Sequence, residues 1–194
     1  MNFELEFPHA DDTVYLAYSR PYPYSKIISH MFEVESKLEL AKASPNEKQK
    51  TKENTKTFSL KLTKQAFIYE RSLLCRTICG LPVPKISITA NRSSALTSLP
   101  LFKRQTIFVT ARVHPGETNS STVFEGFLDK LAENVGDSAV LSNYVVKMVP
   151  CMNPDGVVCG NYRSSLAGVD LNRQWILPNQ DLHPEVFYTK QMMH

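Results

Sequence analysis

The sequence of 194 residues predicts an α/β fold, with a mixed, mostly parallel sheet flanked by helices. An apolar run at Ile107–Val113 is typical of a buried strand, and a second run at Tyr144–Val149 follows after an amphipathic segment. A strand, a helix and a strand joined by a crossover of this length indicate a parallel pair. Upstream, Leu73–Ile78 and Lys85–Thr89 flank Gly80–Pro84, which predicts a hairpin.

The first third of the chain predicts a short strand, a helix and a polar loop. The strand is expected at Val14–Tyr18 and is broken by the proline-rich segment Pro21–Tyr24. Ser25 can cap the helix that follows. Its apolar positions keep helical spacing: Ile27, Ile28, Met31, Val34 and Leu38. The lysine-rich stretch Ala43–Lys56 is expected to be a flexible loop or insertion.

The segment after the buried strand predicts a helix that covers the sheet. Asn91–Pro100 is a polar loop before that strand. Thr118 or Asn119 can cap the helix. Its core-facing stripe is expected at Val123, Phe124, Phe127, Leu128 and Leu131. Ligands of α/β sheets gather at the carboxyl ends of strands, where His114 falls.

Composition excludes several classes of protein. A charged content of 21% and a net charge of +3, without clustered basic and aromatic residues, argue against a nucleic-acid partner. The sequence has no apolar run of membrane-spanning length and no signal-peptide pattern at its start, so we expect a cytoplasmic protein without a membrane partner. Each of the four cysteines is interpreted as a buried or half-buried free thiol: Cys75, Cys79, Cys151 and Cys159.

The motif His-Pro-Gly-Glu at His114–Glu117 is the best candidate for chemistry. Imidazole and carboxylate are ligand types that a catalytic zinc ion takes while it keeps a position for water. The pair alone is weak evidence, because His30 and Glu33 repeat the same spacing. That second pair falls within the predicted helix, where it is interpreted as a surface pair.

Two arginines extend the candidate site. Arg163 and Arg173 lie in glycine-containing, non-helical sequence beyond the second parallel strand. A guanidinium group matches a carboxylate through two hydrogen bonds. Asn153–Gly156 reads Asn-Pro-Asp-Gly, which by itself predicts a tight turn. With His114 and Glu117, the arginines predict a zinc site next to an anion-binding site.

These motifs resemble the zinc carboxypeptidase superfamily, most closely its cytosolic carboxypeptidase branch, the tubulin-trimming enzymes. The resemblance rests on His114–Glu117, Asn153–Gly156, Gly160–Arg163 and Asp170–Trp175 in this order. Further counterparts are Tyr15–Tyr18 with Pro21–Tyr24, Leu74–Ile78 and Asp181–Glu185. The resemblance implies that residues 1–62 hold the tail of a β-rich N-terminal domain, a linker helix and a polar loop. Residues 63–194 would form the first half of the catalytic domain.

The resemblance also implies a role for each matching residue. His114 and Glu117 would be two of three zinc ligands, and Arg163 would stabilise the oxyanion of the tetrahedral intermediate. Asn172 and Arg173 would bind the C-terminal carboxylate of the substrate. His183, beside Pro184, matches a structural position at a helix start.

The implied function is zinc-dependent removal of C-terminal residues, glutamates, from protein tails such as those of tubulin. The third zinc ligand and the general-base glutamate of the family are expected beyond residue 194, so the chain is expected to be incomplete, with an unprotected sheet edge. Two alternatives stay open. One is a catalytically inert homologue that acts as a binding module, and the other is a zinc amidohydrolase of small acylated amino acids.

Overall fold

A computed structural model describes residues 4–40, 60–63, 67–91, 99–135 and 138–193. It contains a five-stranded sheet in the order β1-β2-β3-β5-β4. The strands are β1 (Leu60–Thr63), β2 (Phe67–Arg76), β3 (Pro82–Ala90), β4 (Gln105–Thr110) and β5 (Tyr144–Val149). The helices are α1 (Tyr24–Leu40), α2 (Thr118–Glu133), α3 (Ala139–Asn143), α4 (Pro154–Cys159) and α5 (Pro184–Met193). Short 3-10 turns lie at Leu101–Lys103 and Leu171–Arg173.

The expected α/β class and the parallel pair are confirmed, but the prediction of a mostly parallel sheet is wrong. β4 and β5 run parallel, with Ile107 opposite Val146. The pairings β1–β2, β2–β3 and β3–β5 are antiparallel. A short turn can join only antiparallel strands, whereas the crossover through α2 lets β4 and β5 run parallel. The hairpin predicted around Gly80–Pro84 is β2–β3, and its first strand begins earlier than expected, at Phe67.

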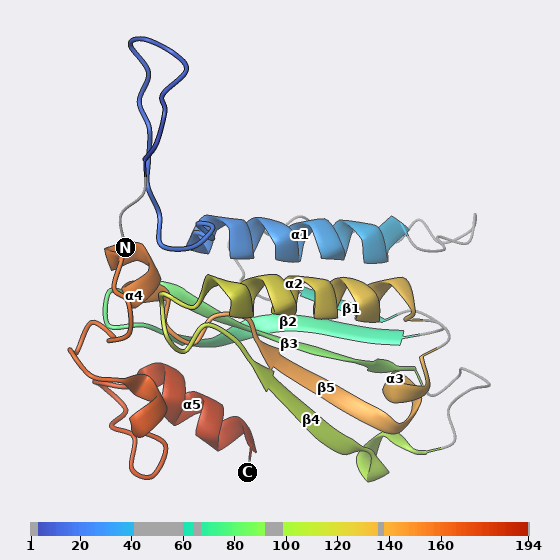
Figure 1. Ribbon diagram of the computed structural model, residues 1–194. Coiled ribbons are helices and arrows are strands. Elements are labelled where there is room, and N and C mark those ends of the chain that lie inside the picture. The colour runs from blue at the N-terminus through green and yellow to red at the C-terminus, as the bar shows by residue number, and fades with distance from the viewer. Residues whose placement is uncertain (1–3, 41–59, 64–66, 92–98, 136–137, 194) are drawn as a thin grey trace.

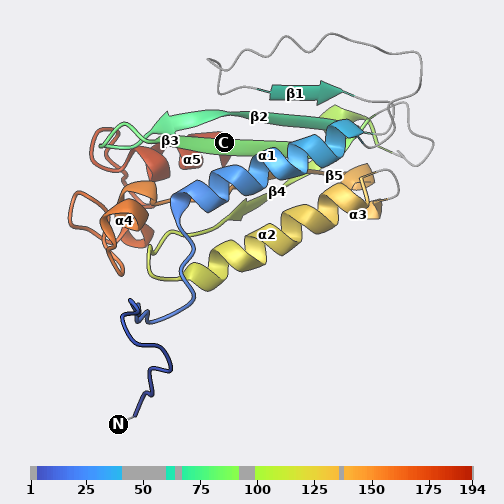
Figure 2. The same cartoon turned by 90° about the horizontal axis from the view of Figure 1, so that it is seen from above.

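Helices α1 and α2 lie side by side over one face of the sheet, and α5 lies on the other side (Figures 1 and 2). The main core joins α1, α2 and the sheet through Met31, Val34, Leu38, Phe124, Leu128, Leu131, Ile86, Ile88, Val146 and Met148. A second cluster joins α5 to the ends of β2, β3 and β5 through Cys75, Val83, Val149 and Val186. No helix within the described ranges is both long and apolar enough to cross a membrane.

The predicted stripe of α2 is only partly confirmed. Phe124 and Leu128 are buried, whereas Val123 is 72% and Phe127 is 37% exposed. Each exposed residue precedes a buried one, and successive helical residues are rotated by about 100°. The packing of α2 against the sheet and α1 therefore buries a narrower stripe than the sequence suggested.

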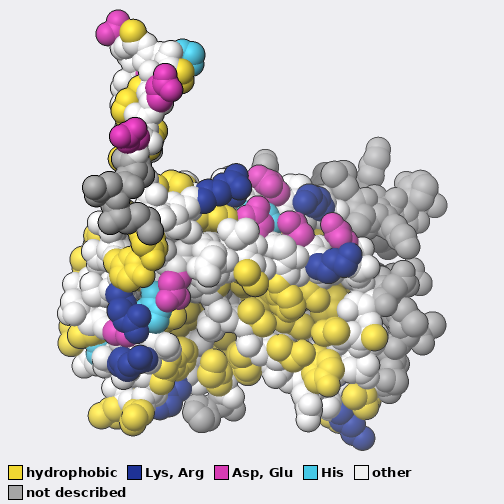
Figure 3. All heavy atoms as spheres, in the orientation of Figure 1, with side chains coloured by type: hydrophobic (Ala, Val, Ile, Leu, Met, Phe, Trp, Pro, Cys, Tyr) yellow, Lys and Arg dark blue, Asp and Glu magenta, His cyan; other side chains and the backbone are white. Residues whose placement is uncertain are grey.

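The interface between α1 and its neighbours contains buried polar pairs. Glu35 accepts hydrogen bonds from Tyr69 at 3.0 Å and from the Arg71 Nε at 2.6 Å, and the two charged residues are buried. His30 is also buried, with its Nε2 3.2 Å from the Asp129 carboxylate on α2. The prediction of a surface pair at His30 is therefore wrong, because α2 covers this side of α1. Figure 3 shows opposite charges interleaved along the outer side of α1 and α2, where Lys37 lies 3.4 Å from Asp129.

Other local predictions had mixed outcomes. Val14–Tyr18 is exposed and forms no strand, and the Tyr18 ring lies edge-on to the Tyr162 ring, with the ring centroids 5.8 Å apart. The polar loop predicted at 43–56, and most of the one predicted at 91–100, lie outside the described residues. All four cysteines are free; two are buried, whereas Cys79 and Cys159 are exposed, contrary to expectation. Both exposed cysteines lie at ends of elements, in the β2–β3 turn and at the last position of α4.

A buried carboxyl group lies in the first turn of α5. Glu185 is 3% exposed. Desolvation by burial, and more weakly the negative charge of Asp155, raise the pKa of Glu185 from 4.5 to about 7, against a lowering contribution from its own backbone N–H. The folded state thus holds a proton that the unfolded chain releases at lower pH.

We expect Glu185→Gln to stabilise the protein at mildly alkaline pH. A raised folded-state pKa gives a stabilising contribution that is complete below the unfolded pKa and is lost as pH rises through the folded pKa, here through about 7. Glutamine removes the buried charge, so the variant should gain roughly 3 kcal/mol over the original chain at about pH 8, and much less at about pH 4.5.

Urea denaturation at the two pH values measures this difference. The control is Glu133→Gln, which removes an exposed carboxylate paired with Lys130 at 3.4 Å. It should change stability by less than about 0.5 kcal/mol at either pH. An equal effect of Glu185→Gln at both pH values would contradict the explanation.

Candidate active site

The chain leaves the sheet at the end of β4 through a strained residue. Arg112 has a φ of 56°, a left-handed conformation that is uncommon outside glycine. Its buried guanidinium donates to the Pro115 carbonyl at 2.8 Å and to the Tyr22 carbonyl at 3.0 Å. The strand therefore ends at Thr110. The sequence predicted that it would continue to Val113. The turn directs His114 toward the carboxyl ends of β4 and β5.

Two glycines allow the loops of the site to pack backbone against backbone. The Gly116 N–H donates to the Tyr162 carbonyl at 2.7 Å. A Cβ on Gly116 would lie 2.6 Å from the Tyr162 ring and 2.8 Å from that carbonyl oxygen. A Cβ on Gly156 would overlap the Pro115 ring and lie 2.7 Å from Asn153 Oδ1. The His-Pro-Gly-Glu loop is thus enclosed by segments 40 or more residues away in the sequence.

The Asn-Pro-Asp-Gly segment begins a helix, so the prediction of a tight turn was incomplete. Asn153 caps α4, and its Oδ1 accepts the Gly156 N–H at 3.0 Å. The buried Asp155 carboxylate accepts from the Thr77 hydroxyl at 2.6 Å and from the Cys79 N–H at 3.1 Å. This helix connects the β2–β3 turn to the site.

His114 and Glu117 face each other as the sequence suggested. His114 Nδ1 lies 3.0 Å from Glu117 Oε1, and its Nε2 lies 3.0 Å from Asp170 Oδ1. The imidazole is buried, while the Glu117 side chain is 49% exposed. A carboxylate can only accept, so Nε2 donates to Asp170. Nδ1 and Oε1 then need a proton or a cation between them.

Asp170 joins the other parts of the site, and the sequence reasoning assigned it no role. Its Oδ2 accepts from Arg163 Nε at 2.9 Å and lies 2.8 Å from Arg163 Nη2. Its Oδ1 also accepts the Asn172 N–H at 2.8 Å. Desolvation raises the pKa of Asp170, but the hydrogen bonds from Asn172 and His114 and the charge of Arg163 outweigh it, so the net pKa is lowered. The Asp-x-Asn spacing, typical of a side-chain-capped turn, was the signal available in the sequence.

The predicted carboxylate-binding pair is more open. Asn172 and Arg173 belong to the 3-10 turn at Leu171–Arg173, and both are exposed. Asn172 Oδ1 accepts from Trp175 Nε1 at 3.1 Å. Arg173 Nη1 lies 3.4 Å from the Asn172 carbonyl. Within the described part of the chain, the Arg173 guanidinium forms no ion pair, so it faces solvent beside the assembled residues.

The donor pair suits a zinc ion, although it supplies only part of a ligand set. Ligand atoms about 2.1 Å from a tetrahedral zinc are about 3.4 Å apart, close to the separation of Nδ1 and Oε1. The Asp170 hydrogen bond fixes the imidazole tautomer that leaves Nδ1 for the metal. Among the residues that the structure describes, no group of three or more His, Cys, Asp or Glu side chains could hold a metal ion.

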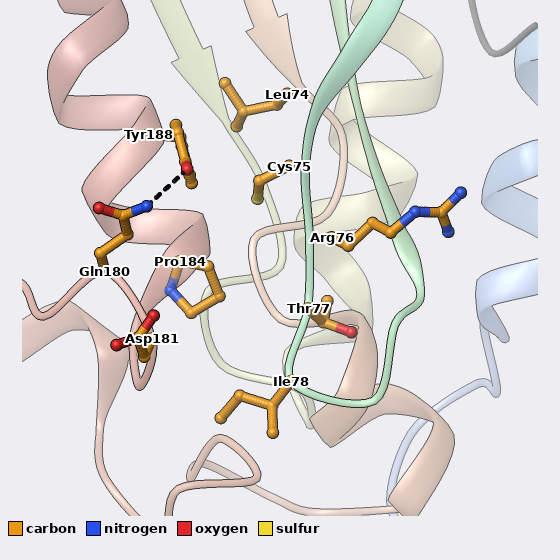
Figure 4. Close-up of a pocket in the computed structure, with 9 residues that line it drawn as sticks. All are labelled: Leu74, Cys75, Arg76, Thr77, Ile78, Gln180, Asp181, Pro184 and Tyr188. Carbon is orange, nitrogen blue, oxygen red and sulfur yellow. Dashed lines mark hydrogen bonds between the residues drawn. The ribbon is translucent and has the colours of Figure 1, made fainter.

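A groove of about 480 Å³ lies between the end of β2 and α5, away from this site (Figure 4). The groove contains none of the predicted site residues. It is lined by Leu74, Cys75, Arg76, Thr77, Ile78, Gln180, Asp181, Pro184 and Tyr188. His183, just before α5, is buried, and its Nδ1 accepts the Asn179 N–H at 3.2 Å. These contacts agree with the structural role predicted for His183.

Comparisons with known proteins identify what the chain resembles. A family model described as zinc carboxypeptidase matches residues 74–191. The chain is 40% identical to cytosolic carboxypeptidase 1 of Xenopus laevis, in an alignment that covers 100% of this chain and 14% of that protein. It is 36% identical to cytosolic carboxypeptidase 4 of Mus musculus, again over 100% of this chain and 15% of that protein. The chain therefore spans about a seventh of the length of these relatives.

Solved structures support the fold. A metallo-carboxypeptidase from Burkholderia cenocepacia superposes with a TM-score of 0.63 at 24% identity, covering 90% of this chain and 38% of that chain. A carboxypeptidase A from Helicoverpa armigera gives a TM-score of 0.56 at 14% identity, covering 91% of this chain and 43% of that chain. The architecture therefore corresponds to part of a carboxypeptidase fold.

We expect Gly116→Ala to destabilise the protein by about 1–3 kcal/mol, because the added methyl group would overlap the Tyr162 ring and carbonyl. The matched control is Gly126→Ala in α2, where a Cβ meets nothing within 4 Å. That substitution should stabilise the helix by up to about 1 kcal/mol. Urea denaturation measures both, and equal effects would contradict the close packing at Gly116.

Proposed function

The chain belongs to the zinc carboxypeptidase family, in its cytosolic carboxypeptidase branch, and from this premise we propose that it carries part of a metallocarboxypeptidase active site. The proposed activity is hydrolysis of C-terminal residues, glutamates, from protein tails such as those of tubulin, in the cytoplasm. The observation that carries the proposal is the Asp170 carboxylate, which joins His114 to Arg163. The preference for glutamate and tubulin comes from the resemblance to this branch.

His114 and Glu117 are the residues that would hold zinc in this chain. When bound, zinc supplies a Lewis acid that activates water and polarises the scissile carbonyl. Asp170 keeps the His114 ring oriented and its Nε2 protonated, which makes Nδ1 the better electron donor. The exposed side of Glu117 leaves this position open to solvent and substrate.

Arg163 is placed to stabilise negative charge on a carbonyl oxygen. Asp170 binds its Nε and Nη2 atoms, so the guanidinium is held at one edge. In the described part of the chain, the contacts of Arg163 leave Nη1 to donate elsewhere. A preorganised cationic donor stabilises an oxyanion more strongly than the neutral ground state, which lowers the barrier to acyl transfer.

Asn172 and Arg173 would select a substrate with a free C-terminus. The Asn172 backbone is held by Asp170, and its side chain is held by Trp175. Arg173 follows directly and exposes its guanidinium, which matches a carboxylate. A carboxylate bound here would place the last peptide bond at a defined distance from Arg163 and His114, as exopeptidase activity requires.

We expect zinc binding by this chain to depend on the pair His114 and Glu117 and not on the pair His30 and Glu33. His114→Ala and Glu117→Ala should each abolish zinc retention measured by mass spectrometry at micromolar zinc, because each removes half of the ligand pair. Glu33→Ala is the matched control, since Glu33 has the same spacing from a histidine but is exposed on α1. Absence of zinc from the original chain would contradict a metal site in these residues.

We expect peptide binding to depend on a free C-terminal carboxylate and on Arg173. A glutamate-tailed peptide should bind about 10-fold or more tightly than its C-terminal amide, and Arg173→Ala should remove the difference, since charged hydrogen bonds contribute about 1.5–3 kcal/mol. Arg76→Ala is the control, because Arg76 is exposed and donates to the Gly80 carbonyl at 2.8 Å. Calorimetry measures the affinities of both peptides for the original chain and for each variant. Binding without zinc retention would favour a binding module over an enzyme.

A further inference from the structure

Two exposed thiols lie outside the proposed active site. Cys79 belongs to the turn between β2 and β3, and Cys159 is the last residue of α4. They are 80 residues apart in the sequence and have no part in the proposed chemistry. The other two cysteines, Cys75 and Cys151, are buried in the apolar clusters.

The β2–β3 turn is held against α4 by one carboxylate. Asp155 Oδ1 accepts from the Thr77 hydroxyl at 2.6 Å, and Oδ2 accepts from the Cys79 N–H at 3.1 Å. The turn is also closed internally, because the Thr77 N–H donates to the Leu81 carbonyl at 2.9 Å and the Gly80 N–H donates to the Thr77 carbonyl at 2.9 Å. The position of Cys79 relative to the first turn of α4 is therefore well defined.

Cys159 lies on the same side of α4 as this carboxylate. It follows Asp155 by four residues, and residues at this spacing are neighbours on one helix face, about 5–6 Å apart between Cβ atoms. Helical side chains lean toward the N-terminus, so the Cys159 side chain leans over the turn that contains Asp155. The Cys79 N–H and the Cys159 position are thus both next to the Asp155 side chain.

The electrostatic environment agrees with this proximity. Desolvation, followed by the negative charges of Asp155 and of Cys159, raises the pKa of the Cys79 thiol. A thiol with a raised pKa reacts slowly near neutral pH, because the thiolate is the nucleophile. Proximity to a second thiol compensates, since the second step of oxidation becomes intramolecular.

We propose that Cys79 and Cys159 form a reversible disulfide when hydrogen peroxide oxidises the protein. One thiolate attacks the peroxide, the O–O bond breaks, and a sulfenic acid and water are formed after protonation. The second thiolate then attacks the sulfenic sulfur, an S–S bond forms, and a second water leaves. The two thiols lose two electrons and two protons in total, and the peroxide is reduced to two waters.

The disulfide would tie the β2–β3 turn to the C-terminal end of α4. Gly160, which follows with a φ of 73°, leads directly into the segment that carries Tyr162 and Arg163. The bond would close a loop of about 80 residues and so restrict the unfolded chain, which stabilises the folded one. It would also restrain the beginning of the Arg163 segment.

The test is oxidation of the purified chain with hydrogen peroxide at mildly alkaline pH, followed by non-reducing digestion and mass spectrometry. We expect a monomer lighter by two hydrogen atoms, a peptide pair linked through Cys79 and Cys159, and reversal by dithiothreitol. The linked form should also melt at a higher temperature than the reduced form.

Two variants separate this bond from other oxidation products. Cys159→Ser, at an exposed position, should remove the linked peptides and leave Cys79 as a sulfenic or sulfinic acid. Cys75→Ser, at a buried position, should leave the link intact. A folded, oxidised chain in which Cys79 and Cys159 are modified separately, or linked only between molecules, would overturn the proposal.

Discussion

The Asp170 carboxylate is the interaction on which the candidate site depends. Its two oxygens accept from the His114 ring, the Arg163 guanidinium and the Asn172 backbone. One side chain therefore orients a candidate metal ligand, a candidate oxyanion donor and the turn that presents Arg173. Charge-assisted hydrogen bonds of this kind are stronger and shorter than neutral ones, so they hold exposed loops in one arrangement.

Close backbone packing holds the loops near enough for the Asp170 carboxylate to bind residues from each of them. The Gly116 N–H reaches the Tyr162 carbonyl, and Pro115 occupies the space over Gly156. Side chains at either glycine would separate the loops by more than a hydrogen bond allows. Asp155 adds a third connection by binding the β2–β3 turn to α4. The site is thus built from turns fixed by backbone contacts, as functional loops on a rigid scaffold commonly are.

The sheet explains where these turns meet. The parallel pair β4–β5 directs two chain segments, after Thr110 and after Val149, to the same edge. The antiparallel strands β2 and β3 broaden the surface that α1 and α2 cover. The candidate site residues therefore lie at the end of the one parallel strand pair of the described sheet. The remaining strands support this pair.

The sequence by itself determined the parallel pair, the β2–β3 hairpin and the motif residues, because these depend on local hydrophobic period, turn chemistry and residue type. It also brought His114 and Glu117 together, since they are three residues apart. Only the tertiary structure decided the direction of the remaining strands, the burial of His30 and Glu185, and the exposure of Val123. Only it revealed Asp170 as the shared partner. These features depend on contacts between distant segments, and no local pattern in the chain encodes which segments will meet.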